Sequence, residues 1–299
     1  MYRLTINLLA LTALGAQGAN AYEPDVEKGR YMYYAGGCAS CHAAPASAKC
    51  DDPQSADALN PVGGRCLKTE FGTFYVPNIT PDKESGIGGW SEDDFVRAMR
   101  EGTSPEGHNY YPAFPYDSYQ RMKNEDLIDL WAFMKTLKPE ASQIPDHDLS
   151  FPYSIRRGLS VWKGVYLDGK PFEPDPARSD QVNRGAYLVE GPGHCGECHT
   201  QRDSLGGKIA DKALAGAPDP EGKGFIPNIT PHETGIASWS EKDIAYALQT
   251  GFLPSGDVMG GTMTAVVKNM AKLTAEDRAA IAAYLKSVPP VANAPAKTD

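Results

Sequence analysis

Hydrophobic residues recur with helical spacing in two long segments, residues 125–135 and 275–286. In each segment the apolar side chains fall on one face of a helix. They are Leu127, Leu130, Trp131 and Met134 in the first segment, and Ile281, Tyr284 and Leu285 in the second. No stretch alternates apolar and polar residues for long enough to predict a sheet. The pattern therefore predicts an all-α fold with long loops.

Capping residues mark where the expected helices begin and end. Further helices are expected over 26–35 and 181–190, and each of them runs into glycine. The predicted N-caps are Ser91, Asn124, Ser240 and Thr274, and glycines end two helices at Gly102 and Gly251. Asp277 stands three residues after Thr274, in the position of a capping box. These signals predict helices separated by loops along the whole chain.

The chain contains an internal repeat, which indicates duplicated modules. The run PNITP at 77–81 returns at 227–231, an offset of 150 residues, and a Gly-Ile run that precedes Trp90 returns before Trp239 at an offset of 149. We predict two homologous domains at 22–140 and 181–290, an ordered connecting strap at 141–180, and a flexible tail at 291–299. Loops of different length explain why the offsets differ.

The N-terminus has the features of a secretory signal peptide. Arg3 provides a positive charge, residues 4–16 are apolar, and Ala19-Asn20-Ala21 is a small-residue cleavage site. The apolar run is too short to span a bilayer, and no later segment approaches the length that spanning needs. We expect residues 1–21 to be removed and the mature chain to be periplasmic, without an integral membrane segment.

Charge and composition exclude some classes of partner. The formal net charge is −9 at pH 7, so the chain is not suited to nucleic acid or to an anionic lipid surface. An acidic protein of this kind suits a partner with a basic docking patch. No catalytic triad, paired-carboxylate site or phosphate loop is visible in the sequence.

Two CxxCH motifs carry the clearest chemistry. They comprise Cys38, Cys41 and His42 in the first module, and Cys195, Cys198 and His199 in the second. In a c-type haem site the two thiols form thioethers with the haem vinyl groups, and the following His ligates the iron. We therefore predict two covalently bound haem c groups, with iron ligated by each motif His. His194, next to the second motif, is expected to be a hydrogen-bonded structural residue.

The other two cysteines, Cys50 and Cys66, flank a loop rich in Asp, Pro and Gly. In an oxidising compartment such a remaining pair predicts a disulfide. Closing a loop of this size stabilises the fold by roughly 3 kcal/mol in the chain-entropy model. A metal pair or a redox-active dithiol is the alternative interpretation.

A second axial ligand is expected on the distal side of each iron, and methionine there raises the reduction potential. Met263 lies in a Gly-Gly-Thr-Met run ahead of the last helix, where a distal loop is expected to present a thioether. Met259 and Met270 are the competing candidates. Methionine also commonly serves only to fill a core.

These motifs resemble those of the periplasmic cytochrome c subunits of bacterial alcohol, gluconate and aldehyde dehydrogenases. The resemblance covers nearly all of the mature chain. It rests on CxxCH, on the PNITP-to-GIGGWS run at 77–91, on Tyr111-Pro112-Ala113-Phe114-Pro115-Tyr116, and on the run around Met263. It implies two tandem class I cytochrome c domains. Familiar members carry three haem motifs, whereas this chain has two.

The first module departs from the family pattern at its distal side. Where the family often reads Tyr-Pro-Ala-Met-Pro-Tyr and uses the Met as ligand, this chain has Phe114, which cannot ligate iron. Met122, eight residues later, is the expected replacement. His108, Met99 and an open sixth position are the alternatives.

The sequence favours an electron carrier over an enzyme. Two covalently held haems would accept electrons from a periplasmic dehydrogenase and pass them to a respiratory cytochrome or oxidase. The alternative is a diheme enzyme, of the thiosulfate dehydrogenase or peroxidase type, with its chemistry at the first haem. Phe114 is the feature that favours this alternative, because a reactive haem needs an open or displaceable position.

Overall fold

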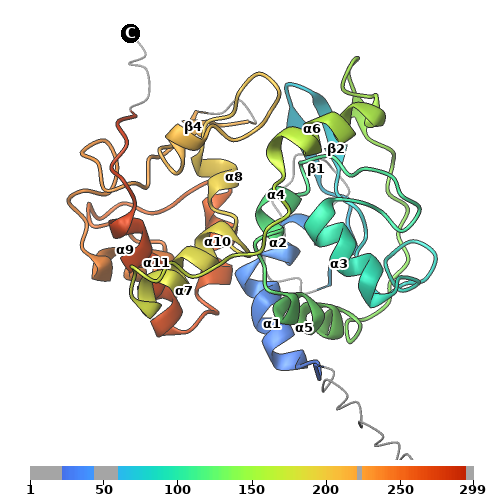
Figure 1. Cartoon of the computed structure of the whole chain (residues 1–299), viewed down its shortest axis with the longest axis horizontal. Coiled ribbons are helices and arrows are strands. Elements are labelled where there is room, and N and C mark those ends of the chain that lie inside the picture. Colours follow the sequence, from blue (N-terminus) through green and yellow to red (C-terminus); the bar gives the residue numbers. More distant parts are fainter. Residues whose placement is uncertain (1–21, 44–59, 221–223, 294–299) are drawn as a thin grey trace, which may run out of the picture.

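The computed structural model describes residues 22–43, 60–220 and 224–293. Figure 1 shows two mostly helical modules side by side, with the segment after α6 crossing between them. The first module contains α1 (Val26–Ala35), α2 (Cys38–His42), α3 (Glu92–Glu101), α4 (Tyr116–Tyr119) and α5 (Asn124–Met134). The second contains α7 (Asp180–Glu190), α8 (Gly196–His199), α9 (Glu241–Thr250), α10 (Met263–Met270) and α11 (Ala275–Ser287). The repeat found in the sequence is thus a repeat of helices.

Two helices in each module cross at a glycine. A Cβ atom on Gly29 of α1 would lie 1.9 Å from the carbonyl oxygen of Asp129 in α5, and one on Gly185 of α7 would lie 1.9 Å from that of Ala280 in α11. The helix backbones therefore touch, which only glycine permits. The buried face of α5 and that of α11 are the ones expected from the apolar pattern.

The capping signals are confirmed at most helix starts. Ser91 and Ser240 form reciprocal capping boxes with Asp94 and Asp243. Both helices end at a left-handed glycine, as expected. The prediction for Asn124 is wrong: Lys123 is the N-cap, without a side-chain cap bond, and Asn124 is the first helical residue.

The expectation of no sheet is also wrong. Short strands form an antiparallel sheet in the order β1 (Cys66–Thr69), β2 (Gly72–Tyr75) and β3 (Asp148–Leu149), and a second pair joins β4 (Ala217–Pro218) to β5 (Phe225–Ile226). Lys68 pairs with Thr73 in the first hairpin, and Gly72 pairs with Leu149. Strands this short carry too few residues to show a period of two.

The strap between the modules forms secondary structure. It contributes β3 to the sheet and then forms the turn η1 (Arg156–Gly158) and α6 (Leu159–Tyr166). Trp162 of α6 is buried, and its indole N–H donates to the carbonyl of Leu205 at 3.0 Å. A further turn, η2 (Ala210–Lys212), precedes β4 in the second module.

The PNITP loop of each module binds the chain that follows the closing helix. The amide of Asn78 and the hydroxyl of Thr80 both donate to the carbonyl of Glu140, at 2.7 and 3.1 Å. In the second module Asn228 donates to the carbonyl of Val291 at 2.8 Å. Val291 and Asn293 of the expected flexible tail are therefore hydrogen-bonded into the fold, and 294–299 lie outside the described residues.

The two modules are joined by a reciprocal exchange of tyrosine hydroxyls. Tyr31 of α1 accepts from the backbone N–H of Thr274, the N-cap of α11, at 3.1 Å and donates to Asp277 at 2.6 Å. Its counterpart is Tyr187 of α7, which accepts from the N–H of the N-cap Lys123 at 3.2 Å and donates to Asp126.

Each tyrosine hydroxyl thus accepts the N-cap N–H of the closing helix in the other module. Thr274 does accept from the N–H of Asp277 at 3.1 Å, so its role as N-cap is confirmed. The carboxylate of Asp277, however, faces Tyr31 and Arg184. The reciprocal half of that box is supplied across the interface between the modules.

Candidate functional site

A large cavity of about 2330 Å³ extends through both modules, and both CxxCH motifs line it. Its wall is rich in aromatic and aliphatic side chains from α3, α5, α9 and α11, the helices that form the two hydrophobic cores. A cavity with apolar walls and a few convergent polar groups is typical of a cofactor site. The predicted haem-attachment residues are therefore brought together.

Each motif forms one helical turn. Cys38 and Cys41 lie in α2 with His42 as its last residue, and α8 ends on His199 in the same way. Residues three and four apart share a helix face. Both sulfurs and the imidazole of a motif can therefore bind the same molecule. Gly37, with a φ of +58°, provides the left-handed turn that starts the first motif.

The PNITP loop orients the motif histidines. The Nδ1–H of His42 donates to the carbonyl of Pro77 at 2.8 Å, and that of His199 donates to the carbonyl of Pro227 at 2.8 Å. Because a carbonyl can only accept, the proton lies on Nδ1 and the Nε2 lone pair is available for a metal. Both prolines belong to the sequence repeat. Their role could not be predicted, because the orientation of their carbonyl groups toward the histidines depends on the tertiary structure.

Burial keeps both imidazoles neutral. It lowers the pKa of His42 to about 4, with the Pro77 hydrogen bond acting in the opposite direction. It also lowers the pKa of His199. A neutral imidazole is the form that ligates iron. Both histidines are thus ready to bind metal at neutral pH.

The motif cysteines do not have the electrostatics of a redox-active dithiol. Burial raises the pKa of Cys38 and of Cys195 to about 12, and that of Cys198 to about 11. A catalytic CxxC pair needs a lowered thiol pKa. These sulfurs lie on the wall of an apolar cavity, next to a neutral histidine that can ligate a metal. This arrangement instead fits covalently attached haem.

The candidates for the distal ligand of the second haem lie on the cavity wall. Met263 is the first residue of α10, packs against the core of the second module and lines the cavity. It was expected in a loop, but the helix begins at it. Met259 and Met270 also line the cavity, so the structure leaves all three available.

The first module places its candidates differently. Phe114 and Met99 line the cavity, as does Met134. Met122 is 1 % exposed within the core and is not among the lining residues, and His108 is exposed and also does not line it. The position expected for the first distal ligand is therefore not brought to the cavity wall.

The predicted disulfide stays a prediction. Cys66 is the first residue of β1 and is largely buried. Cys50 lies outside the described residues.

A buried ionic cluster connects the modules beside the second motif. Glu197, inside that motif, pairs with Lys208 at 2.6 Å and with Arg202 at 2.6 Å, and Lys208 also reaches Asp117 at 3.1 Å. Burial would raise the pKa of Glu197, but Lys208 and Arg202 outweigh it and hold that pKa at about 2. One sequence feature points to this cluster, the acid Glu197 between the motif cysteines.

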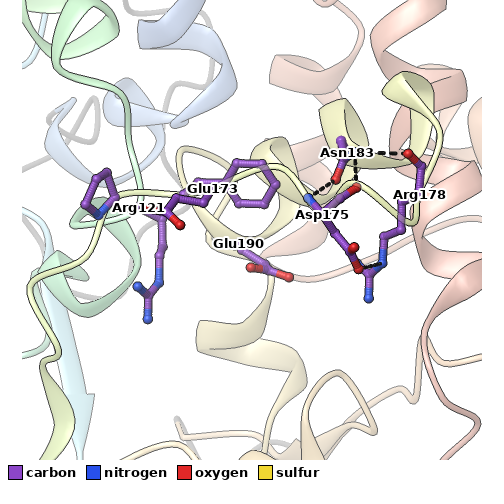
Figure 2. A pocket seen from close by; sticks show the side chains of 8 residues that line it. Arg121, Glu173, Asp175, Arg178, Asn183 and Glu190 are labelled. Atoms are coloured by element: carbon purple, nitrogen blue, oxygen red, sulfur yellow. Dashed lines mark hydrogen bonds and ion pairs between the residues drawn. The ribbon is translucent and has the colours of Figure 1, made fainter.

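A second, smaller cavity of about 290 Å³ lies beside the strap and is shown in Figure 2. Two of its charged side chains pair with each other, Arg178 with Asp175 at 3.3 Å, and the amide of Asn183 donates to the Asp175 carbonyl at 2.9 Å. These contacts anchor the strap to α7.

A family model described as "Cytochrome c" matches residues 26–138 and 182–289, one match for each module. The chain is 49 % identical over 267 residues to "Diheme cytochrome c-type" of Cereibacter sphaeroides, covering 89 % of this chain and 87 % of that protein. It is 37 % identical over 293 residues to "Fructose dehydrogenase cytochrome subunit" of Gluconobacter japonicus, with 95 % and 58 % covered.

A similar match is "Gluconate 2-dehydrogenase cytochrome c subunit" of Pantoea cypripedii, 37 % identical over 294 residues, with 95 % of this chain and 64 % of that protein covered. The chain thus spans about three-fifths of these dehydrogenase subunits. Among the described residues no helix is both long and apolar enough to cross a membrane. With both modules matched and both motifs in place, the chain belongs to the cytochrome c family and is an electron-transfer cytochrome that carries two covalently bound haem c groups.

Proposed function

We propose that this chain takes electrons from a periplasmic dehydrogenase and passes them, through its two haems, to a respiratory cytochrome or oxidase. The observation that supports this most directly is the single cavity that both motifs line. The names of the similar dehydrogenase subunits support the class of donor. The fold class behind the proposal is two tandem class I cytochrome c domains.

The two attachment motifs lie close together across the module interface. The Nε2 atom of His194, directly before Cys195, lies 3.2 Å from the carbonyl oxygen of Gly36, which stands two residues before Cys38. Ser40, within the first motif, accepts from the amide of Asn269 at 2.6 Å. Residues of one motif thus touch the other module directly, which favours electron exchange inside one chain.

The residues divide the work of holding two redox groups. When bound, each haem supplies one-electron chemistry at its iron. Cys38, Cys41, Cys195 and Cys198 would hold the haems covalently, and His42 and His199 would ligate the irons. Met263 is the proposed distal ligand of the second haem, where a thioether raises the potential. The wall of both sites is rich in apolar side chains.

Processing and location belong to the same proposal. Residues 1–21 would be cleaved as a signal peptide, and the mature chain would work in the periplasm. An oxidising compartment would also support the Cys50–Cys66 bridge. Mass spectrometry of the secreted chain tests all three features: we expect an N-terminus at Tyr22, two added haem masses and no free thiol.

The function is tested by direct reduction. The purified chain is mixed with the catalytic subunits of fructose, alcohol or gluconate dehydrogenase and the matching substrate, and haem absorbance is followed by stopped flow. We expect substrate-dependent reduction of both haems by at least one of these enzymes. Mixtures without substrate are the control. Failure of all three to reduce either haem would contradict a dehydrogenase donor of this class.

An enzyme with its chemistry at the first haem remains the second candidate, because Phe114 stands where the family places a ligand. It predicts turnover of thiosulfate or hydrogen peroxide and rapid cyanide binding to one haem of the resting protein. Absence of both leaves the carrier as the function.

A further inference from the structure

The distal sides of the two modules can be aligned residue by residue. The N–H of Tyr110 donates to the carbonyl of Gly102 at 2.8 Å, and the N–H of Met259 donates to that of Gly251 at 2.8 Å. Isolated bridges join 103 to 109 and 252 to 258. Every one of these pairs is related by the offset of 149 residues that also relates the two capping serines. The distal loops are therefore in register.

The same offset places Phe114 at the position of Met263 and Met99 at the position of Leu248. All four side chains line the cavity. In the second module the loop position carries a thioether and the helix position carries a hydrocarbon. In the first module this arrangement is reversed. Each module thus presents one methionine from this pair of positions.

Met99 lies in the last turn of α3 and lines the cavity. It precedes Gly102 by one helical turn, and a Cβ on Gly102 would lie 2.3 Å from the ring of Tyr116, the first residue of α4. Arg100 donates to the backbone carbonyls of Gln120 at 3.3 Å and Met122 at 2.8 Å. The C-terminal turn of α3 is thereby tied to the segment that follows Phe114.

The motif histidine lines the same cavity as Met99. His42 is fixed by the carbonyl of Pro77, in the loop that precedes α3. Met134, the other methionine on the wall of the first module, ends α5, the helix that crosses α1 just before the motif. At the offset of 151 residues that relates α5 to α11, its counterpart is Leu285. This pair of positions takes no part in the methionine exchange between 99/248 and 114/263.

We propose that Met99 is the distal axial ligand of the first haem, with its thioether sulfur donating a lone pair to the iron. The loop methionine has been replaced by a helix methionine, and Phe114 fills the space that the loop methionine takes up in the second module. Met99 is 6 % exposed and packs in one cluster with Phe114, so the sulfur is kept from water.

This assignment rests on the haem binding that underlies the proposed function. It is tested by the Met-to-ferric-iron charge-transfer band, recorded on the full chain after the two haems have been counted as pyridine haemochromes. Wild type is expected to show a band intensity for two haems. Met99→Leu should lose half of it, whereas Met122→Leu and Met134→Leu should lose none.

Two further variants keep the test open if Met99→Leu does not accumulate. Phe114→Met in the wild-type background should leave the band at two haems, because the sixth position is already filled. The double variant Met99→Leu/Phe114→Met should regain the intensity that Met99→Leu loses.

The contrary results are distinct. A wild-type band for one haem that rises to two in Phe114→Met overturns the assignment and shows an open first haem. A full band in Met99→Leu, or a loss in Met122→Leu, overturns it in favour of another ligand. Either result leaves reduction by a dehydrogenase untouched, so the ligand and the function fail separately.

Discussion

The two modules are alike on the histidine side of their cofactor sites and different on the distal side. Both histidines donate from Nδ1 to a proline carbonyl at 2.8 Å. On the distal side, Phe114 and Met99 of the first module occupy the positions that Met263 and Leu248 occupy in the second, and all four line the cavity. Duplication has kept the groups that attach the cofactor and has changed those that tune it. The distal groups are therefore the part of each site that would set the potentials of the two haems apart.

The largest effect is expected from the distal ligand of the second haem. Met263→Leu removes the proposed thioether, so the potential of this haem should fall by a sizeable part of the roughly 0.8 V that axial ligation spans. Spectroelectrochemical titration of each haem measures this change. Met259→Leu is the matched control, and a fall in that variant instead would reassign the ligand.

The ionic cluster beside the second motif is the next difference between the modules. Glu197 corresponds to Ser40, at the offset of 157 residues that separates the motifs. Lys208→Met should leave Glu197 and Asp117 buried without their shared cation, at a cost of about 3–5 kcal/mol in unfolding free energy. Chemical denaturation measures this cost. Because Lys208→Met removes a positive charge beside the second motif, this substitution should also lower the reduction potential of the second haem more than that of the first.

Two controls limit the interpretation of Lys208→Met. Asn269→Ala, which removes the neutral partner of Ser40, should change either potential far less, because no charge is left unpaired. Equal shifts at both haems would show that the cluster acts on the chain as a whole and does not distinguish the modules.

The helix crossings should respond equally, because the modules are alike there. Gly29→Ala and Gly185→Ala each place a methyl group 1.9 Å from a backbone oxygen, so the helices must move apart. We expect a loss of about 3 kcal/mol for each, at the upper end of the cost of overpacking. Thermal unfolding of the two variants measures it. A loss in only one would show that the crossings are not equivalent.

The smallest effect is expected from the exchanged tyrosine hydroxyls. Tyr31→Phe removes one bond to a carboxylate, worth about 1.5 kcal/mol, and Tyr187→Phe is its counterpart. Burial would raise the pKa of Asp277, but Arg184 and Tyr31 outweigh it and lower that pKa below its usual 3.8. Its stabilising contribution is therefore complete above pH 3.8 and is lost as pH falls through the lowered pKa.

The difference between wild type and Tyr31→Phe should therefore shrink in acid. Urea denaturation at pH 7 and at pH 3 measures it, with Tyr34→Phe, elsewhere on α1, as the matched control. A difference that is constant with pH would mean that the hydroxyl acts through Thr274 and not through Asp277.

Much of the fold was predictable, because local signals define it. The bounds of α1 were predicted as observed, and the serine caps and glycine ends of α3 and α9 were correct. Each depends on residues within one turn. The short strands were missed, since β1 pairs with β2 and β3 through backbone bonds that leave little trace in four-residue segments.

The site was predictable where covalent chemistry dictates spacing, as in the two CxxCH motifs. The groups that surround the motifs could not be predicted. The carbonyl of Pro77, the reach of Lys208 to Asp117 and the lining position of Met99 all depend on segments far apart in sequence. Proximity to Phe114 in sequence favours Met122, whereas the structure places Met122 in the core and away from the cavity lining.

The tyrosine exchange has a consequence for the history of the chain. Tyr31 serves the closing helix of the second module, and Tyr187 serves that of the first. These are the contacts of a two-fold symmetric dimer, in which the same patch on each subunit meets its copy. The strap makes that pairing independent of concentration. In a homodimer a substitution changes both subunits. In a fused chain it changes one module only, so the distal ligand position can differ between the two modules.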